Sequence, residues 1–125
     1  MHRSRIGVFL IDHPGSSYDE ALRFWGGVQG VEPVPEDGDD DYASLGRVGS
    51  LKLEGQRLGE GEPRVHLDIE TDDVAAEVAR VVDLGATVIK ERERFTVLQD
   101  PGGLIFCVVP VQTGEDFERE ATTWP

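Results

Sequence analysis

The stretch from Arg64 to Pro110, RVHLDIETDDVAAEVARVVDLGATVIKERERFTVLQDPGGLIFCVVP, decides the fold of this chain. Apolar and polar residues alternate at its start, which is the period-two pattern of a half-buried strand. We therefore expect an imidazole and two carboxylates side by side on one face. The apolar face holds Val65, Leu67 and Ile69, and the polar face holds His66, Asp68 and Glu70.

A helix and three further strands are predicted to follow. The helix is expected over residues 73–84, because valines line one side of it between the cap cluster Thr71–Asp73 and the stop signal Gly85. Strands are expected at 87–90 and 95–99. The DPGG turn at 100–103 then leads into a strand at 104–109, which is apolar on both faces and should be central in its sheet. This half of the chain has the order β-α-β-β-β.

The first half of the chain repeats this order. We predict a strand at 6–11 and a helix at 17–27, starting at a Ser17/Glu20 capping box, with Trp25 packing between helix and sheet. Strands are expected at 31–35, 42–45 and 48–54. The acidic run 36–41 does not have the spacing of a calcium loop and is expected to be a solvated loop, and the Gly-rich stretch 55–63 is expected to link the halves.

The end of the chain, residues 112–125, is acidic and carries Phe117 and Trp124. We expect it to be a frayed terminus, with docking of Trp124 on the body of the protein as the alternative.

Composition indicates a single domain and excludes several classes of partner. A chain of 125 residues can bury a core without a disulfide or a metal. The formal charge of −13 repels phosphate backbones and anionic lipid, so neither nucleic acid nor a membrane surface is expected as a partner. The same charge attracts cations. The single cysteine agrees with a reducing compartment, and we predict a cytoplasmic location. No GxSxG, P-loop, HExxH or GxGxxG motif occurs.

Three local sequences, VHLDIETDD (65–73), DLGA (83–86) and DPGGLIFCVV (100–109), together with the order of elements, resemble a glyoxalase-like domain. This family belongs to the vicinal oxygen chelate superfamily, which includes glyoxalases, bleomycin-resistance proteins and extradiol dioxygenases. The resemblance implies one α+β domain over 1–125, in which two βαβββ modules (about 5–56 and 64–110) form a cupped mixed sheet with helices outside. An acidic C-terminal tail, 111–125, would follow.

The resemblance also identifies candidate metal ligands. Metal-dependent members of the superfamily place ligands on the first and last strand of each module, and these positions match His66, Cys107 and, within one or two residues, Glu54. The first strand of the chain offers no donor. A catalytic metal needs about three protein ligands, so we expect no cofactor, with a divalent metal at His66, Glu54 and Cys107 as the alternative. Otherwise Cys107 is a buried, unreactive thiol and His66 a cavity-lining or hydrogen-bonded histidine.

Two functions follow from the resemblance. The first is a metal-free protein that binds or sequesters an apolar or cationic small molecule, with His66, Asp68, Glu70 and Glu54 lining the cup. The second is a metal-dependent lyase, isomerase or dioxygenase, with Glu54 as a base. A metal-free enzyme with His66 as base and a homodimer both stay open.

Overall fold

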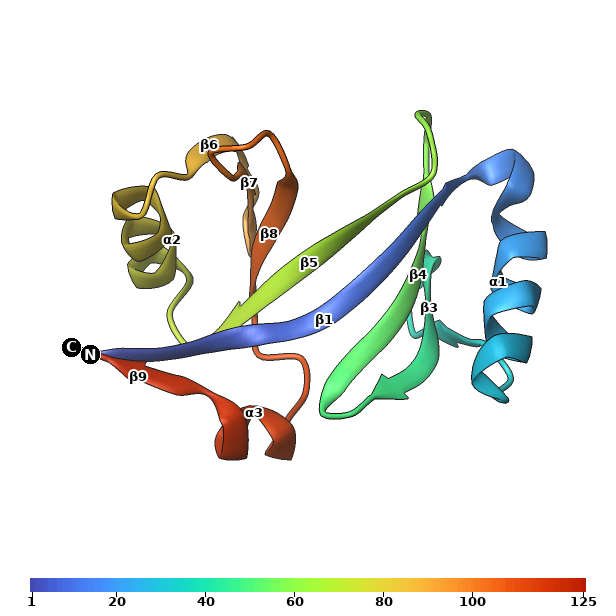
Figure 1. Cartoon of the computed structure of the whole chain (residues 1–125), viewed down its shortest axis with the longest axis horizontal. Coiled ribbons are helices and arrows are strands. Elements are labelled where there is room, and N and C mark those ends of the chain that lie inside the picture. Colours follow the sequence, from blue (N-terminus) through green and yellow to red (C-terminus); the bar gives the residue numbers. More distant parts are fainter. The chain divides into compact units, whose positions relative to one another are not determined.

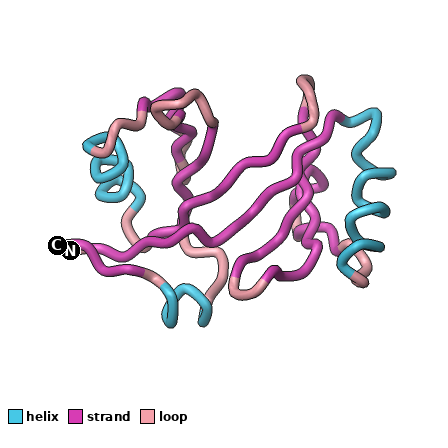
Figure 2. Tube along the Cα trace, viewed as in Figure 1, coloured by secondary structure: helices cyan, strands magenta, loops and turns pink.

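The computed structural model describes residues 1–125 and contains two βαβββ modules followed by a short helix and strand (Figures 1 and 2). The first module consists of β1 (His2–Pro14), α1 (Gly15–Gln29), β2 (Val34–Glu36), β3 (Asp39–Val48) and β4 (Leu51–Leu58). The second consists of β5 (Arg64–Thr71), α2 (Val74–Asp83), β6 (Thr87–Glu91), β7 (Thr96–Gln99) and β8 (Ile105–Pro110), and the chain ends with α3 (Glu115–Glu120) and β9 (Thr122–Trp124). The predicted α+β fold of two βαβββ modules is confirmed. No helix is long and apolar enough to cross a membrane.

The chain forms two compact units, and β1 contributes to both of them. Unit 1 comprises Met1–Val8 and His66–Pro125, and unit 2 comprises Phe9–Val65. The start of β1 is therefore grouped with the elements of the second module.

In unit 1 the strand order is β1-β5-β8-β7-β6, and β9 pairs with β1. β8 runs parallel to β5 and antiparallel to β7, so the strand that is apolar on both faces is central, as predicted. The core is formed by Val81 from α2, Leu98 from β7 and Val108 from β8, and Ile69 of β5 packs against this cluster. The apolar face of β5 thus belongs to the helix-covered side of the sheet.

Local signals in the second module have the expected effect. The Asp73 side chain accepts a hydrogen bond from the Ala76 backbone N–H at 3.0 Å and so caps α2. Gly85, with φ of 119°, takes a backbone conformation that other residues rarely adopt, and α2 ends just before it. In the DPGG turn, Asp100 Oδ1 accepts hydrogen bonds from the N–H groups of Gly102 and Leu104.

In unit 2, α1 packs on a sheet in which β4 lies between β3 and β1. Ile11, Leu45 and Leu53 form the core, and Trp25 packs against them as the sequence predicted. The predicted capping box is wrong: α1 begins at Gly15 after Pro14, and the Ser17 hydroxyl donates to the Pro14 carbonyl.

Strand limits in unit 2 also differ from the prediction. β3 runs through Val48 to a turn at Gly49, and β4 continues through part of the expected linker to Leu58. The reason is pairing across the hairpin, where Gln56 lies opposite Tyr42 and donates to its hydroxyl at 3.0 Å. The acidic run 36–41 is not the predicted loop throughout, because Glu36 ends β2, only residues 37–38 form the turn, and β3 starts at Asp39.

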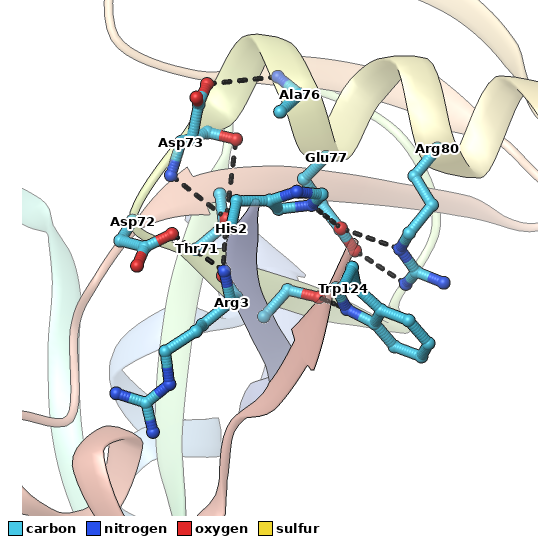
Figure 3. A network of polar contacts seen from close by, with 10 residues as sticks. His2, Arg3, Thr71, Asp72, Asp73, Ala76, Glu77, Arg80 and Trp124 are labelled. Carbon is cyan, nitrogen blue, oxygen red and sulfur yellow. Dashed lines mark hydrogen bonds and ion pairs between the residues drawn. The ribbon is translucent and has the colours of Figure 1, made fainter.

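The C-terminal segment is docked on unit 1, so the expectation of a frayed terminus is wrong and the alternative is confirmed. β9 pairs with the start of β1, and the Trp124 indole N–H donates to Ser4 Oγ at 2.9 Å. The Arg80 guanidinium lies 3.8 Å from the centroid of the Trp124 ring (Figure 3). The Phe117 side chain is 1% exposed. Burial of Phe117 and partial burial of Trp124 offset the loss of chain freedom.

Beside Trp124, the buried Glu77 carboxylate joins α2 to β1 (Figure 3). It bonds to His2 Nε2 at 2.7 Å and to two nitrogens of Arg80 at 2.8 Å. Burial alone would raise the pKa of Glu77, but the hydrogen bonds from Arg80 and His2 outweigh it and hold the pKa below its usual value.

Replacing Phe117 by alanine tests the docking of the C-terminal segment. Loss of a buried phenylalanine costs about 3–5 kcal/mol, so we expect the free energy of unfolding, measured by urea denaturation, to fall by that order. Phe24→Ala is the matched control, because Phe24 is 62% exposed. It should lower stability by less than about 1 kcal/mol. Small, equal losses in both variants would contradict docking.

Candidate functional site

The polar face of β5 meets the neighbouring strand β8 at Cys107. Asp68 and Cys107 are partners in the parallel register, so their side chains share one face of the sheet. One donor atom each of His66, Asp68 and Cys107 lies within 4.8 Å of the others. Three of the residues named from the sequence are therefore brought together, and we call them the Asp68 cluster.

The Asp68 cluster contains a carboxylate oxygen that has no hydrogen-bond donor. Asp68 Oδ1 is buried and accepts no hydrogen bond, although the whole side chain is 15% exposed. His66 Nε2 lies 3.4 Å from this oxygen, a contact that is an ion pair when the imidazole is protonated but is not a hydrogen bond. A buried carboxylate oxygen without a donor is costly, so this position favours a cation or a hydrogen-bond donor from outside the chain.

Glu70, the third polar residue of β5, has a different role. Its carboxylate is fully buried and accepts hydrogen bonds from Arg5 Nε at 2.8 Å and from the backbone N–H groups of Gln112 and Thr113. A Cβ at Gly7 would lie 2.2 Å from Glu70 Oε2, so only glycine leaves room for it. Because both carboxylate oxygens of Glu70 accept hydrogen bonds within unit 1, Glu70 is not among the proposed ligand-binding residues.

Glu54 belongs to unit 2, where it forms a polar group with Lys52 and Glu36. It is 7% exposed, and its Oε1 lies 2.6 Å from Lys52 Nζ. The same Nζ lies 3.1 Å from Glu36 Oε1. Lys52 and Glu54 are on one face of β4, while Leu53 between them packs in the core beneath α1.

The surroundings of Glu54 set its protonation near neutral pH. Burial raises the pKa of Glu54 to about 7, with Lys52 acting to lower it and Glu36 acting to raise it further. Burial also acts to raise the pKa of Glu36, but hydrogen bonds with Lys52 and Glu54 lower it overall. A carboxyl group with a pKa of about 7 can both give and take a proton at neutral pH.

Sequence reasoning missed Lys52 and Glu36 as partners of Glu54. Lys52 could have been found, because Leu51 and Leu53 alternate with Lys52 and Glu54 and so place the latter two on one face. Glu36 could not, since it comes from another strand. Asp68 was named as a lining residue but not as a metal donor.

The pKa of Glu54 predicts a dependence of stability on pH. The folded-state pKa, about 7, lies above the value of 4.5 expected in the unfolded chain, so folding takes up a proton between these values. The contribution of Glu54 to stability is fully present below the unfolded value and is lost as the pH rises through the folded one. The Glu54→Gln variant cannot ionise at this position and should not lose this stability. We therefore expect the free energy of unfolding of the variant, relative to that of the wild type, to increase between about pH 5 and pH 8.

Urea denaturation across this pH range measures the effect, and NMR of the Glu54 carboxyl carbon reports its pKa directly. Glu36→Gln serves as the control, because removing the neighbouring carboxylate should lower the pKa of Glu54. An unshifted titration in the wild type would contradict this description of the group.

Comparison with known proteins identifies the fold. Residues 10–109 match a family model described as a glyoxalase-like domain. No curated protein matches the chain. A NAD-dependent benzaldehyde dehydrogenase from Legionella pneumophila has 12% identity and a TM-score of 0.65, with 84% of this chain and 98% of that one covered.

Two further solved structures share the fold. A hypothetical protein from Bacillus halodurans has 16% identity and a TM-score of 0.64, over 87% of this chain and 95% of that one. A 2,2',3-trihydroxybiphenyl 1,2-dioxygenase from Sphingomonas wittichii has 12% identity and a TM-score of 0.57, over 88% of this chain and 41% of that one. At such low identities the likeness concerns the fold alone.

Proposed function

This chain belongs to the glyoxalase-like domain family of the vicinal oxygen chelate superfamily, and we propose that it binds an organic cation at the Asp68 cluster without a metal. The observation that carries the proposal is Asp68 Oδ1, which is buried and accepts no hydrogen bond. An ammonium group of a ligand would supply the missing donor and the opposite charge.

Two further features support a cationic ligand. The formal charge of −13 raises the local concentration of cations around the protein. His66 and Cys107 place an imidazole nitrogen and a thiol within 4.8 Å of the carboxylate, so polarisable groups border it. A cytoplasmic location and a homodimer remain predictions.

A thermal-shift titration with 1-naphthylmethylammonium tests this function. We expect the stabilisation to grow with concentration as RT ln(1 + [L]/Kd), and added salt to weaken binding. Asp68→Asn should weaken the affinity about tenfold or more, because a charge-assisted hydrogen bond is lost. Asp83→Asn is the control: it makes the same change of charge at an exposed position at the end of α2. Equal affinities of the two variants would contradict the proposal, as would equally strong binding of the anion 1-naphthoate.

A metal-dependent enzyme is the second candidate, and the donor set of the Asp68 cluster favours it. Imidazole nitrogen, carboxylate oxygen and thiolate sulfur all bind zinc, and three such ligands leave a coordination position open. A bound metal would supply Lewis-acid polarisation of a substrate oxygen. In this case His66, Asp68 and Cys107 would hold the ion, and the buried position of His66 would limit access of water.

Elemental analysis after purification without chelator separates the two candidates. We expect no stoichiometric transition metal, and unchanged binding of 1-naphthylmethylammonium in EDTA, because the proposed binding uses no metal. About one zinc, iron, manganese or nickel ion per chain, lost in His66→Ala, would instead favour the metal-dependent enzyme.

A further inference from the structure

A cavity of about 410 Å³ lies in unit 2 between the C-terminal half of α1 and the sheet. Trp25, Val28 and Gln29 line it from the helix, and Phe9, Leu51 and Leu53 line it from the strands. The volume falls in the range of roughly 300–1,000 Å³ that is usual for small-molecule sites. The cavity uses none of the residues of the Asp68 cluster.

The cavity is confined to one end of α1. In the other half of the helix, Leu22 Cδ2 lies 2.4 Å from the position that a Cβ on Gly55 would take, so helix and sheet are in close contact there. The gap next to Tyr18 and Leu22 has no room for even a water molecule. Loose packing of the whole helix therefore does not explain the cavity.

The lining selects against charged ligands. It contains no ionisable side chain. A charged ligand would lose its hydration there and gain no partner of opposite charge, which is unfavourable. The one polar residue is Gln29. Its amide Nε2 donates to the carbonyls of Leu45 and Arg47 at 3.2 and 3.1 Å, which leaves the amide oxygen to accept a hydrogen bond.

The exposed valines of the lining indicate what a ligand would cover. Val28 is 61%, Val48 53% and Val65 49% exposed. A cluster of exposed apolar side chains beside a hollow is typical of a binding site. A hollow of this volume fits a small molecule, whereas a stable protein partner needs a surface of about 800 Å².

We propose that this cavity binds a neutral, flat, apolar molecule of aromatic type, with room for a single hydroxyl that donates to Gln29. This is a second site with a different chemistry from that of the Asp68 cluster, because it excludes the cations that Asp68 attracts. Its occupation does not depend on the function proposed above.

Fluorescence titration with the neutral probe N-phenyl-1-naphthylamine tests the proposal on the full chain. We expect saturable enhancement of the probe's fluorescence and displacement by neutral 1-naphthol. Charged competitors, 1-naphthoate and 1-naphthylmethylammonium, should displace the probe at least about tenfold less effectively. Absence of saturable binding, or displacement by the ions as readily as by naphthol, would overturn the proposal.

A pair of variants locates the site. Val48→Glu places a charge in the lining and should weaken probe binding about tenfold or more. Val34→Glu is the matched control, because Val34 is a valine of the same unit, 60% exposed and outside the lining. It should bind the probe like the wild type. Both positions are exposed, so both variants should fold, which urea denaturation checks. Equal affinity of the two variants for the probe would overturn the site. A wild-type dimer in sedimentation that Val48→Glu dissociates would overturn it too, because a second copy of the chain would then cover the cavity.

Discussion

Unit 1 depends on the buried carboxylate of Glu70. A fully buried carboxylate is unfavourable unless donors surround it, and here β1 supplies Arg5 while the segment after β8 supplies Gln112 and Thr113. Glu70 thus ties three separate parts of the chain together and directs the segment after β8 back toward β1, where β9 pairs. The same tie fixes the end of β5, and with it the register that places Asp68 opposite Cys107.

The fold could be predicted largely because its signals are local. The alternation in β5 separates Ile69, which packs against the core, from Asp68 on the opposite face, and the Asp73 cap marks the start of α2. The docked C-terminal segment could not be predicted in this way. Trp124 contacts Ser4 and Arg80, which are far away in sequence, and an acidic run with two aromatic residues resembles a solvated tail until those contacts are known.

In the candidate site, too, local features could be predicted and contacts between distant residues could not. Alternation placed His66 and Asp68 on one face, and the family resemblance pointed to Cys107. The grouping of Asp68 with Cys107, however, depends on strand pairing that no local pattern encodes. Glu54 gives a similar case, since its pKa is raised by burial and by Glu36 from another strand, against the lowering effect of Lys52 two residues before it. Side chains that act together across strands are therefore the part of a site that sequence reasoning locates least well.

The two modules share an order of elements but differ in which side chains pack between helix and sheet. In unit 1 the valines of α2 are small, and Val81 packs with Leu98 and Val108. In unit 2 the large Trp25 packs against Leu53 of the sheet, while the chain turns sharply after α1 at Gly30, with φ of 72°. The cavity lies beside this bulky ring, while Gln29 at the end of α1 is hydrogen-bonded to the carbonyls of Leu45 and Arg47 in β3. We therefore link the proposed apolar site of unit 2 to the size of the helix residues beside it, and the proposed cation site of unit 1 to a carboxylate oxygen that accepts no hydrogen bond.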